Sequence, residues 1–144
     1  MKSNKNSPKQ ILLLLIIFSV QLFFYKSYNK PPNTISINEN SISELSIARL
    51  PVPPKKKILS QRKDIKKIVQ FVNSIKLTKK LDEPFKGWTY LINIKGKDNS
   101  YTISFLGDKI NVNNTWYEID SDIINSLDSI YKDLDCKEED FFNK

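Results

Sequence analysis

The longest uninterrupted apolar stretch lies near the start of the chain. Residues Ile11–Tyr25 contain no charged side chain. Lysines flank this run on both sides, at Lys2, Lys5, Lys9, Lys26 and Lys30. As a helix the run spans about 22 Å, against about 30 Å for a hydrocarbon core. It predicts one N-terminal transmembrane helix whose flanking lysines reach the interface by snorkelling.

The same run favours a retained anchor or uncleaved signal over a removed signal peptide. A cleavage site needs small residues, but the sole alanine is Ala48, and a cut after Ser27 places the bulky Tyr25 at −3. A lipoprotein needs a cysteine directly after the run, whereas the single cysteine is Cys136. A removed signal peptide remains the alternative.

The lysine distribution predicts the orientation in the membrane. More lysines precede the run than follow it closely, which favours a cytoplasmic N-terminus. We therefore expect a single-pass protein of the cell membrane with its domain on the extracytoplasmic side. The expected parts are a short cytoplasmic N-terminus (1–10), an anchor (11–25), a tether (26–40), an α+β domain (41–135) and an acidic tail (136–144).

Beyond the tether, apolar positions first alternate and then recur with helical spacing. The alternation over 41–50 predicts a strand, and 55–59 suits a short edge segment. A single apolar stripe predicts a helix over 61–75, with Ser60 as its N-cap, formed by Ile65, Ile68, Val69, Val72 and Ile75. A loop over 76–87 follows.

Four strands with tight turns come next, over 88–94, 100–106, 109–112 and 115–119. Asp120-Ser-Asp122 then caps a second helix, whose stripe is Ile123, Ile124, Leu127, Ile130, Tyr131 and Leu134. The predicted fold class is α+β, in the order strand, helix, four-stranded antiparallel meander, C-terminal helix. Two helices should cover one sheet face and leave the other wet or partly wet.

The net charge of +7 is unevenly distributed. Residues 1–60 carry nine basic and two acidic side chains, 61–109 carry eleven and five, and 110–144 carry three and nine. The globular part is therefore dipolar. Its halves either complement each other in the fold or present a basic side to phosphate-rich lipid or wall polymer. Nucleic acid is not an expected partner, because no nucleic-acid motif is present.

Missing residue types exclude several kinds of chemistry. The chain has no histidine, one cysteine and three glycines. This composition removes Ser/His and Cys/His nucleophiles, cysteine-rich metal sites and glycine-rich phosphate loops. We expect no cofactor, no metal and no enzymatic activity.

Carboxylates and aromatics are the remaining candidates. Glu118, Asp120 and Asp122 could form an acid/base pair, although capping of the second helix is the simpler interpretation. Six aromatics crowd the meander, namely Trp88, Tyr90, Tyr101, Phe105, Trp116 and Tyr117. Alternation places Trp116 and Tyr117 on opposite faces, so that one ring could stack on a sugar or take a peptide. The candidate ligand-binding residues are Trp88, Tyr90, Trp116 and Tyr117.

Lysines of the first helix are candidate anion-facing residues, namely Lys63, Lys66 and Lys67. Core packing of the aromatics and solvation of the lysines are the simpler interpretations.

Over Asp64–Leu134 three segments follow one another, IKKIVQFVNSIK, GWTYLINIKGKDNSYTISFLGDKINVNNTWYEID and INSLDSIYKDL. Their order resembles a family of small exported domains of unknown function in Firmicutes. The shared features are Asn73-Ser74, Lys97-Asp98, Phe105-x-Gly107 and Trp116-Tyr117. The resemblance implies an exported fold, held by a lipid or a membrane anchor, and no catalytic residue. This chain lacks a lipobox cysteine, which leaves anchoring to Ile11–Tyr25.

Together these patterns predict a membrane-anchored extracytoplasmic module that binds an envelope protein or a wall polymer. One alternative is an inhibitor or immunity protein that acts on a membrane enzyme or a toxin. Another is a carboxylate-dependent hydrolase of an envelope polymer.

Overall fold

The computed structural model describes residues 15–21, 34–50 and 53–142 of the chain. It divides into two compact units, Met1–Pro31 and Pro32–Lys144. In the first unit, residues 15–21 are helical, and their apolar side chains are about half exposed or more. The rest of the predicted anchor 11–25, residues 1–10 and residues 26–33 of the tether lie outside the described residues. Within the described ranges, no helix is long and apolar enough to cross a membrane.

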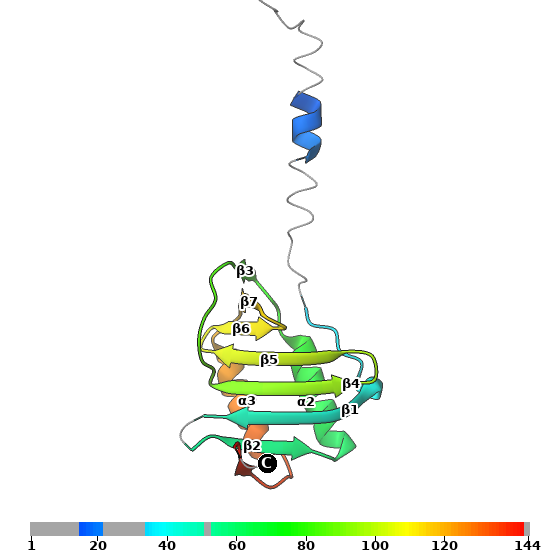
Figure 1. Ribbon diagram of the computed structural model, residues 1–144, viewed down its shortest axis with the longest axis vertical. Coiled ribbons are helices and arrows are strands. Elements are labelled where there is room, and N and C mark those ends of the chain that lie inside the picture. The colour runs from blue at the N-terminus through cyan, green and yellow to red at the C-terminus, as the bar shows by residue number, and fades with distance from the viewer. Residues whose placement is uncertain (1–14, 22–33, 51–52, 143–144) are drawn as a thin grey trace, which may run out of the picture. The chain divides into compact units, whose positions relative to one another are not determined.

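The second unit is an α+β fold built on one antiparallel sheet. In the described part of the chain the sheet has eight strands, in the order β3-β7-β6-β5-β4-β1-β2-β8 (Figure 1). Their bounds are β1 Ile42–Arg49, β2 Lys55–Leu59, β3 Lys79–Leu81, β4 Tyr90–Gly96, β5 Ser100–Leu106, β6 Lys109–Val112, β7 Thr115–Glu118 and β8 Glu139–Asp140. The predicted meander is thus confirmed as β4 to β7.

Tight turns set the register of the meander. Gly107, at φ +59°, sits in the two-residue turn between β5 and β6. Asn113 and Asn114 adopt φ of 47° and 69° between β6 and β7, a conformation that asparagine tolerates better than most residues. The Asn111 side chain accepts a hydrogen bond from the Asn114 amide at 2.9 Å and fixes that turn.

Two amphipathic helices lie on one face of this sheet (Figure 1). They are α2 (Arg62–Ser74) and α3 (Asp122–Asp133), and a single 3₁₀ turn, η1 (Glu39–Ser41), precedes β1. Both helices were predicted from their apolar stripes. The N-cap of α2 is Gln61 rather than Ser60, and its side chain makes no capping bond.

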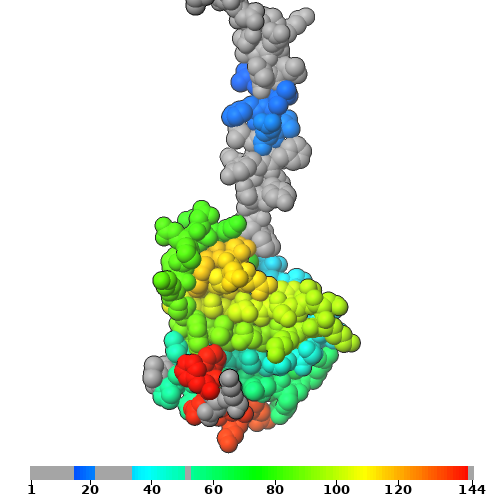
Figure 2. All heavy atoms as spheres, in the orientation of Figure 1, coloured from blue at the N-terminus to red at the C-terminus, as the bar shows by residue number. Residues whose placement is uncertain are grey.

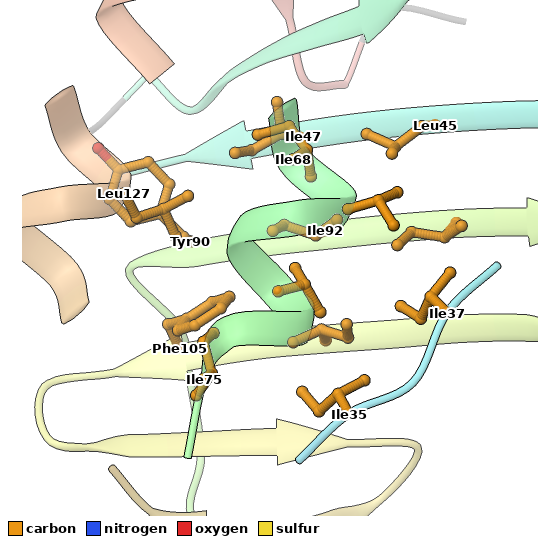
Figure 3. Packing of buried hydrophobic residues seen from close by; sticks show 14 of the residues in the cluster. Ile35, Ile37, Leu45, Ile47, Ile68, Ile75, Tyr90, Ile92, Phe105 and Leu127 are labelled. Carbon is orange, nitrogen blue, oxygen red and sulfur yellow. The ribbon is translucent and has the colours of Figure 1, made fainter. Parts of the chain in front are cut away.

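The core lies between the helices and the sheet (Figure 3). Ile68 of α2 points at Ile47 and Ile92 of the central strands, while Leu127 of α3 packs beside Tyr90. All five of these side chains are at most 3% exposed. Because side chains alternate along a strand, the same strands present a second set of residues to the opposite, helix-free face.

The folded unit extends beyond the predicted domain 41–135 at both ends. Ile35 and Ile37, expected in the tether, are buried in the core (Figure 3). The Asn73 side chain both accepts from the Ile37 amide and donates to the Ile37 carbonyl, each at 2.9 Å, as a neighbouring strand would. In the predicted tail, β8 pairs with β2.

Two further boundaries differ from the sequence expectation. The predicted loop 76–87 contains β3, which pairs with β7 and extends the sheet by one strand. The strand expected from Trp88 begins at Tyr90 instead. Gly87, at φ +88°, and Trp88 therefore belong to the connection that brings the chain from β3 to β4.

Candidate functional site

A groove lies on the helix-free face of the sheet, beside the connection between β3 and β4. Its volume is about 660 Å³, within the range of roughly 300–1,000 Å³ typical of ligand pockets. The loop Asp82–Gly87 forms one wall, and β5, β6 and β7 form the floor. Figure 2 views this face, with the loop (green) beside β6 and β7 (yellow to orange). The residues used below to describe it are Asp82, Glu83, Phe85, Thr102, Ser104, Asn111, Asn114 and Trp116.

Strand register places the floor side chains in a row. Ser104 of β5 pairs with Asn111 of β6, and Asn111 pairs with Trp116 of β7. Neighbouring strands lie about 4.8 Å apart, so these three side chains are direct neighbours on one face. Thr102 lies two residues before Ser104 and therefore faces the same way.

The aromatic end of the groove is a packed pair of rings. Phe85 meets Trp116 edge to face, with ring centroids 5.4 Å apart. The Lys109 ammonium lies 5.3 Å from the centroid of Phe85 and also forms an ion pair with Asp108. That bond to Lys109 lowers the pKa of the Asp108 carboxyl. Trp116 is only 7% exposed because Phe85 covers it.

The four aromatics predicted to bind a ligand do not gather at one place. Trp116 lines the groove, whereas Tyr117 points into the core on the opposite face, as strand alternation predicts. Tyr90 is also buried on the helix side. Trp88 packs against Phe141 of the C-terminal segment, with centroids 5.4 Å apart.

Tyr90 belongs to a polar cluster that ties α3 to the sheet. Its hydroxyl donates to Asp128 at 2.6 Å, and Lys132 also binds Asp128 at 2.6 Å. Burial, followed by the bond to Asp128, raises the pKa of Tyr90 well above its usual value. The bonds from Lys132 and Tyr90 lower the pKa of Asp128. Arg49 joins the cluster through an ion pair with Asp128 at 3.9 Å and also pairs with Glu138 at 3.1 Å.

The three candidate anion-facing lysines each have an acidic neighbour. Lys63 lies 3.4 Å from Asp135, Lys67 lies 3.3 Å from Asp133, and the remaining one, Lys66, lies 4.0 Å from Glu39. The first two pairs join the basic and acidic halves of the domain. These contacts favour the interpretation that the halves complement each other.

The three candidate carboxylates do not converge. Glu118 pairs with Lys79 at 3.6 Å on the helix-free face. Asp120 and Asp122 are exposed at the start of α3, where Asp120 accepts a bond from the Asp122 amide at 3.0 Å. Across the described ranges, no three acidic, histidine or cysteine side chains are placed to hold a metal ion.

The groove contains residues that the sequence reasoning did not select. Phe85, Ser104 and Asn111 carry no motif, and a polar residue at every second strand position is typical of any wet sheet face. Alternation could have grouped Thr102 with Ser104. The position of the loop Asp82–Gly87 over these strands has no signal in the sequence.

Comparisons with family models, with curated proteins and with solved structures find no match to this chain.

Proposed function

We propose that this protein is a non-enzymatic binding module anchored in the cell membrane, with its domain on the extracytoplasmic side. The observation that carries the proposal is the groove between the loop Asp82–Gly87 and strands β5 to β7. It is concave, of ligand-pocket size, and lined by hydrogen-bonding side chains next to an aromatic pair. Its partner is an envelope component, either a protein or a wall polymer.

The charge of the groove supports binding rather than catalysis. The floor residues Thr102, Ser104 and Asn111 have no ionisable group, and the chain has no histidine to activate a hydroxyl nucleophile. Asp82 and Glu83 of the loop are exposed, where water solvates a carboxylate. These two carboxylates are consecutive residues of one wall, whereas an acid/base pair flanks the bond that it cleaves.

The exposed helix 15–21 supports the anchor. Leu15 and Phe18 are each 61% exposed, and Val20 is 47% exposed. An apolar helix with side chains open on all sides is stable where lipid covers it. The Ser19 hydroxyl donates to the Ile16 carbonyl at 2.8 Å, which satisfies the polar group of Ser19 within the helix.

Site-specific photocrosslinking tests the proposal in intact cells of the source organism. A photoreactive amino acid replaces Thr102 in the groove of the full-length chain, and in a second version replaces Gln70, which is exposed on α2. We expect an adduct from position 102 and none from position 70. Protease or glycosidase treatment then shows whether the adduct is protein or polymer. Equal adducts from both positions, or none from position 102, would overturn the proposal.

A further inference from the structure

The floor of the groove is uncharged in a chain rich in charge. Charged residues make up 27% of the sequence, yet Thr102, Ser104, Asn111 and Asn114 line the floor with hydroxyl and carboxamide groups. Asparagine is also a poor strand former, so Asn111 in the interior of β6 is not explained by strand propensity. The chemistry of this surface is therefore neutral hydrogen bonding.

Much of that hydrogen-bonding capacity is unused. The Asn111 carboxamide oxygen accepts from the Asn114 amide, and in the described residues the NH₂ group of this groove-lining side chain donates no hydrogen bond. Within the part of the chain that the structure describes, the side chains of Ser104 and Asn114 make no hydrogen bond, and the Thr102 hydroxyl, which donates to Asn93 at 3.4 Å, can still accept one. Hydroxyls and carboxamides both donate and accept, so the floor can bind a ligand rich in groups of both kinds.

An aromatic pair borders these polar groups. Trp116 is the direct cross-strand neighbour of Asn111, and Phe85 packs on it from the loop. A pyranose ring has the matching character, because its hydroxyls radiate from the rim while its C–H bonds form an apolar face. The sugar can place its hydroxyls on the floor and its apolar face against Phe85, the more exposed ring of the pair, because Trp116 is only 7% exposed.

The strand pairing and the charges around the groove disfavour two other ligand classes, extended peptides and anionic polymers. An extended peptide gains most from pairing with a free sheet edge. The floor strands β5 and β6 are each paired on both sides, and the edge strand beside the groove, β3, has only three residues. A phosphate-bearing or other anionic polymer requires an excess of positive charge. In the groove lining, however, Lys80 is outnumbered by Asp82 and Glu83, and the nearby Lys109 is already paired with Asp108.

We infer that the groove binds uncharged saccharide units of an envelope glycan. This inference rests on the proposed binding function and names the chemistry of its ligand. The hydroxyls and carboxamides of the floor bind the sugar hydroxyls, and the Phe85–Trp116 pair sets the orientation of the ring.

Titration of the full-length chain in mild detergent tests the inference. The probes are a neutral oligomer of N-acetylglucosamine, a uronic acid oligomer of equal length and an uncharged, unstructured peptide. Binding is followed by calorimetry and by tryptophan fluorescence. We expect the neutral oligomer to bind and the uronic acid oligomer to bind at least about tenfold more weakly, because Asp82 and Glu83 repel it.

Two variants remove one floor hydroxyl each with little change in shape. Ser104→Ala and Thr102→Val should each weaken binding of the neutral oligomer about fivefold, the effect of one hydrogen bond. Ser126→Ala, exposed on α3, is the matched control and should leave the affinity unchanged. Failure of the neutral oligomer to bind, or tighter binding of the peptide or the uronic acid oligomer, would overturn the inference.

The two proposals fail in different ways. A protein adduct at position 102, with no saccharide binding, overturns the saccharide inference alone and leaves the binding module standing. Absence of both adduct and saccharide binding overturns the two together.

Discussion

At the scale of single residues, Lys57 is the clearest case of a charge used inside the fold. It is 7% exposed, and its ammonium donates to the carbonyls of Tyr131 and Leu134 at 2.9 and 3.0 Å. These carbonyls lie at the C-terminal end of α3, where the helix leaves acceptors unpaired and carries partial negative charge. Lys57 therefore caps α3 from the neighbouring strand β2.

Replacement of Lys57 by methionine should lower the free energy of unfolding by about 2–3 kcal/mol, because two acceptors lose a charged donor. Urea unfolding followed by tryptophan fluorescence measures the change. Lys97→Met, at an exposed position, is the control and should alter stability by less than about 0.5 kcal/mol. Equal stability of the two variants would contradict the capping role.

The buried tyrosines predict a loss of stability in alkali. Burial and the bond to Asp128 raise the pKa of Tyr90, and burial with the nearby Glu138 carboxylate raises the pKa of Tyr131. Below a pH of 10.0, the pKa of tyrosine in the unfolded chain, both states keep the phenol proton. The buried tyrosines then make their full contribution to the free energy of unfolding. Above it only the unfolded chain releases the proton, so stability falls as pH rises.

Unfolding free energies measured from about pH 8 to pH 11 should therefore decline above pH 10. Tyr90→Phe keeps the ring but removes the titrating hydroxyl, so its decline should be shallower than that of the native chain. A parallel decline in both proteins would exclude Tyr90 as a source of the effect.

Sequence reasoning at this scale identifies apolar residues better than buried polar ones. The stripe of α2 predicted Ile65, Ile68 and Val69 correctly, since each follows the helical period. Lys57 sits in a run of three lysines that is typical of a solvated edge. Its burial depends on α3, which lies more than sixty residues further along the chain.

At the scale of elements, long helices and strands can be predicted from the sequence better than short ones. The helices and the four meander strands carry several repeats of their period, whereas β3 and β8 contain three and two residues and carry none. Ile35 and Ile37 do alternate, but Pro31–Pro32 suggested a tether. Their place in the core depends on tertiary contacts, because Asn73 binds the Ile37 backbone across thirty-six residues and Thr34 forms a bridge with Lys76.

The C-terminal segment should contribute to stability rather than behave as a free tail. Phe141 packs on Trp88, and its amide donates to the Pro54 carbonyl at 2.9 Å. Phe141→Ala should lower the unfolding free energy by about 1–2 kcal/mol. The adjacent Phe142 is 78% exposed, so Phe142→Ala should change it by less than about 0.5 kcal/mol. Chemical unfolding of both variants provides the comparison, and equal losses would contradict the packing argument.

At the scale of the whole molecule, the groove depends on parts of the chain that no local pattern connects. Its wall comes from the loop Asp82–Gly87, and its floor comes from strands that end at Glu118. The alternation of side chains along a strand predicted that Trp116 and Tyr117 lie on opposite faces of the sheet. The presence of two helices, enough to cover one face, predicted that the other face is wet. The loop's path over that face follows from packing of Phe85 on Trp116, which is a tertiary contact.

Deletion of 11–25 should release the protein from the membrane while leaving the domain folded, because Pro32–Lys144 is a compact unit with its own core. Fractionation after carbonate extraction, with protease treatment of intact cells, measures attachment and sidedness. The native chain should stay with the membrane and be cleaved from outside. Unchanged membrane association of the deletion variant would contradict the anchor.

The ends of the sheet have a consequence for crowded copies of this chain. In the described residues the outermost strands are β3 and β8, too short to template a long neighbour, and they carry Lys79 and Lys80 at one end and Glu139 and Asp140 at the other. Short, charged edges oppose edge-to-edge pairing. Copies concentrated on one surface would therefore stay separate, because their edge strands would not pair to form a continuous sheet. Each copy would keep its groove open.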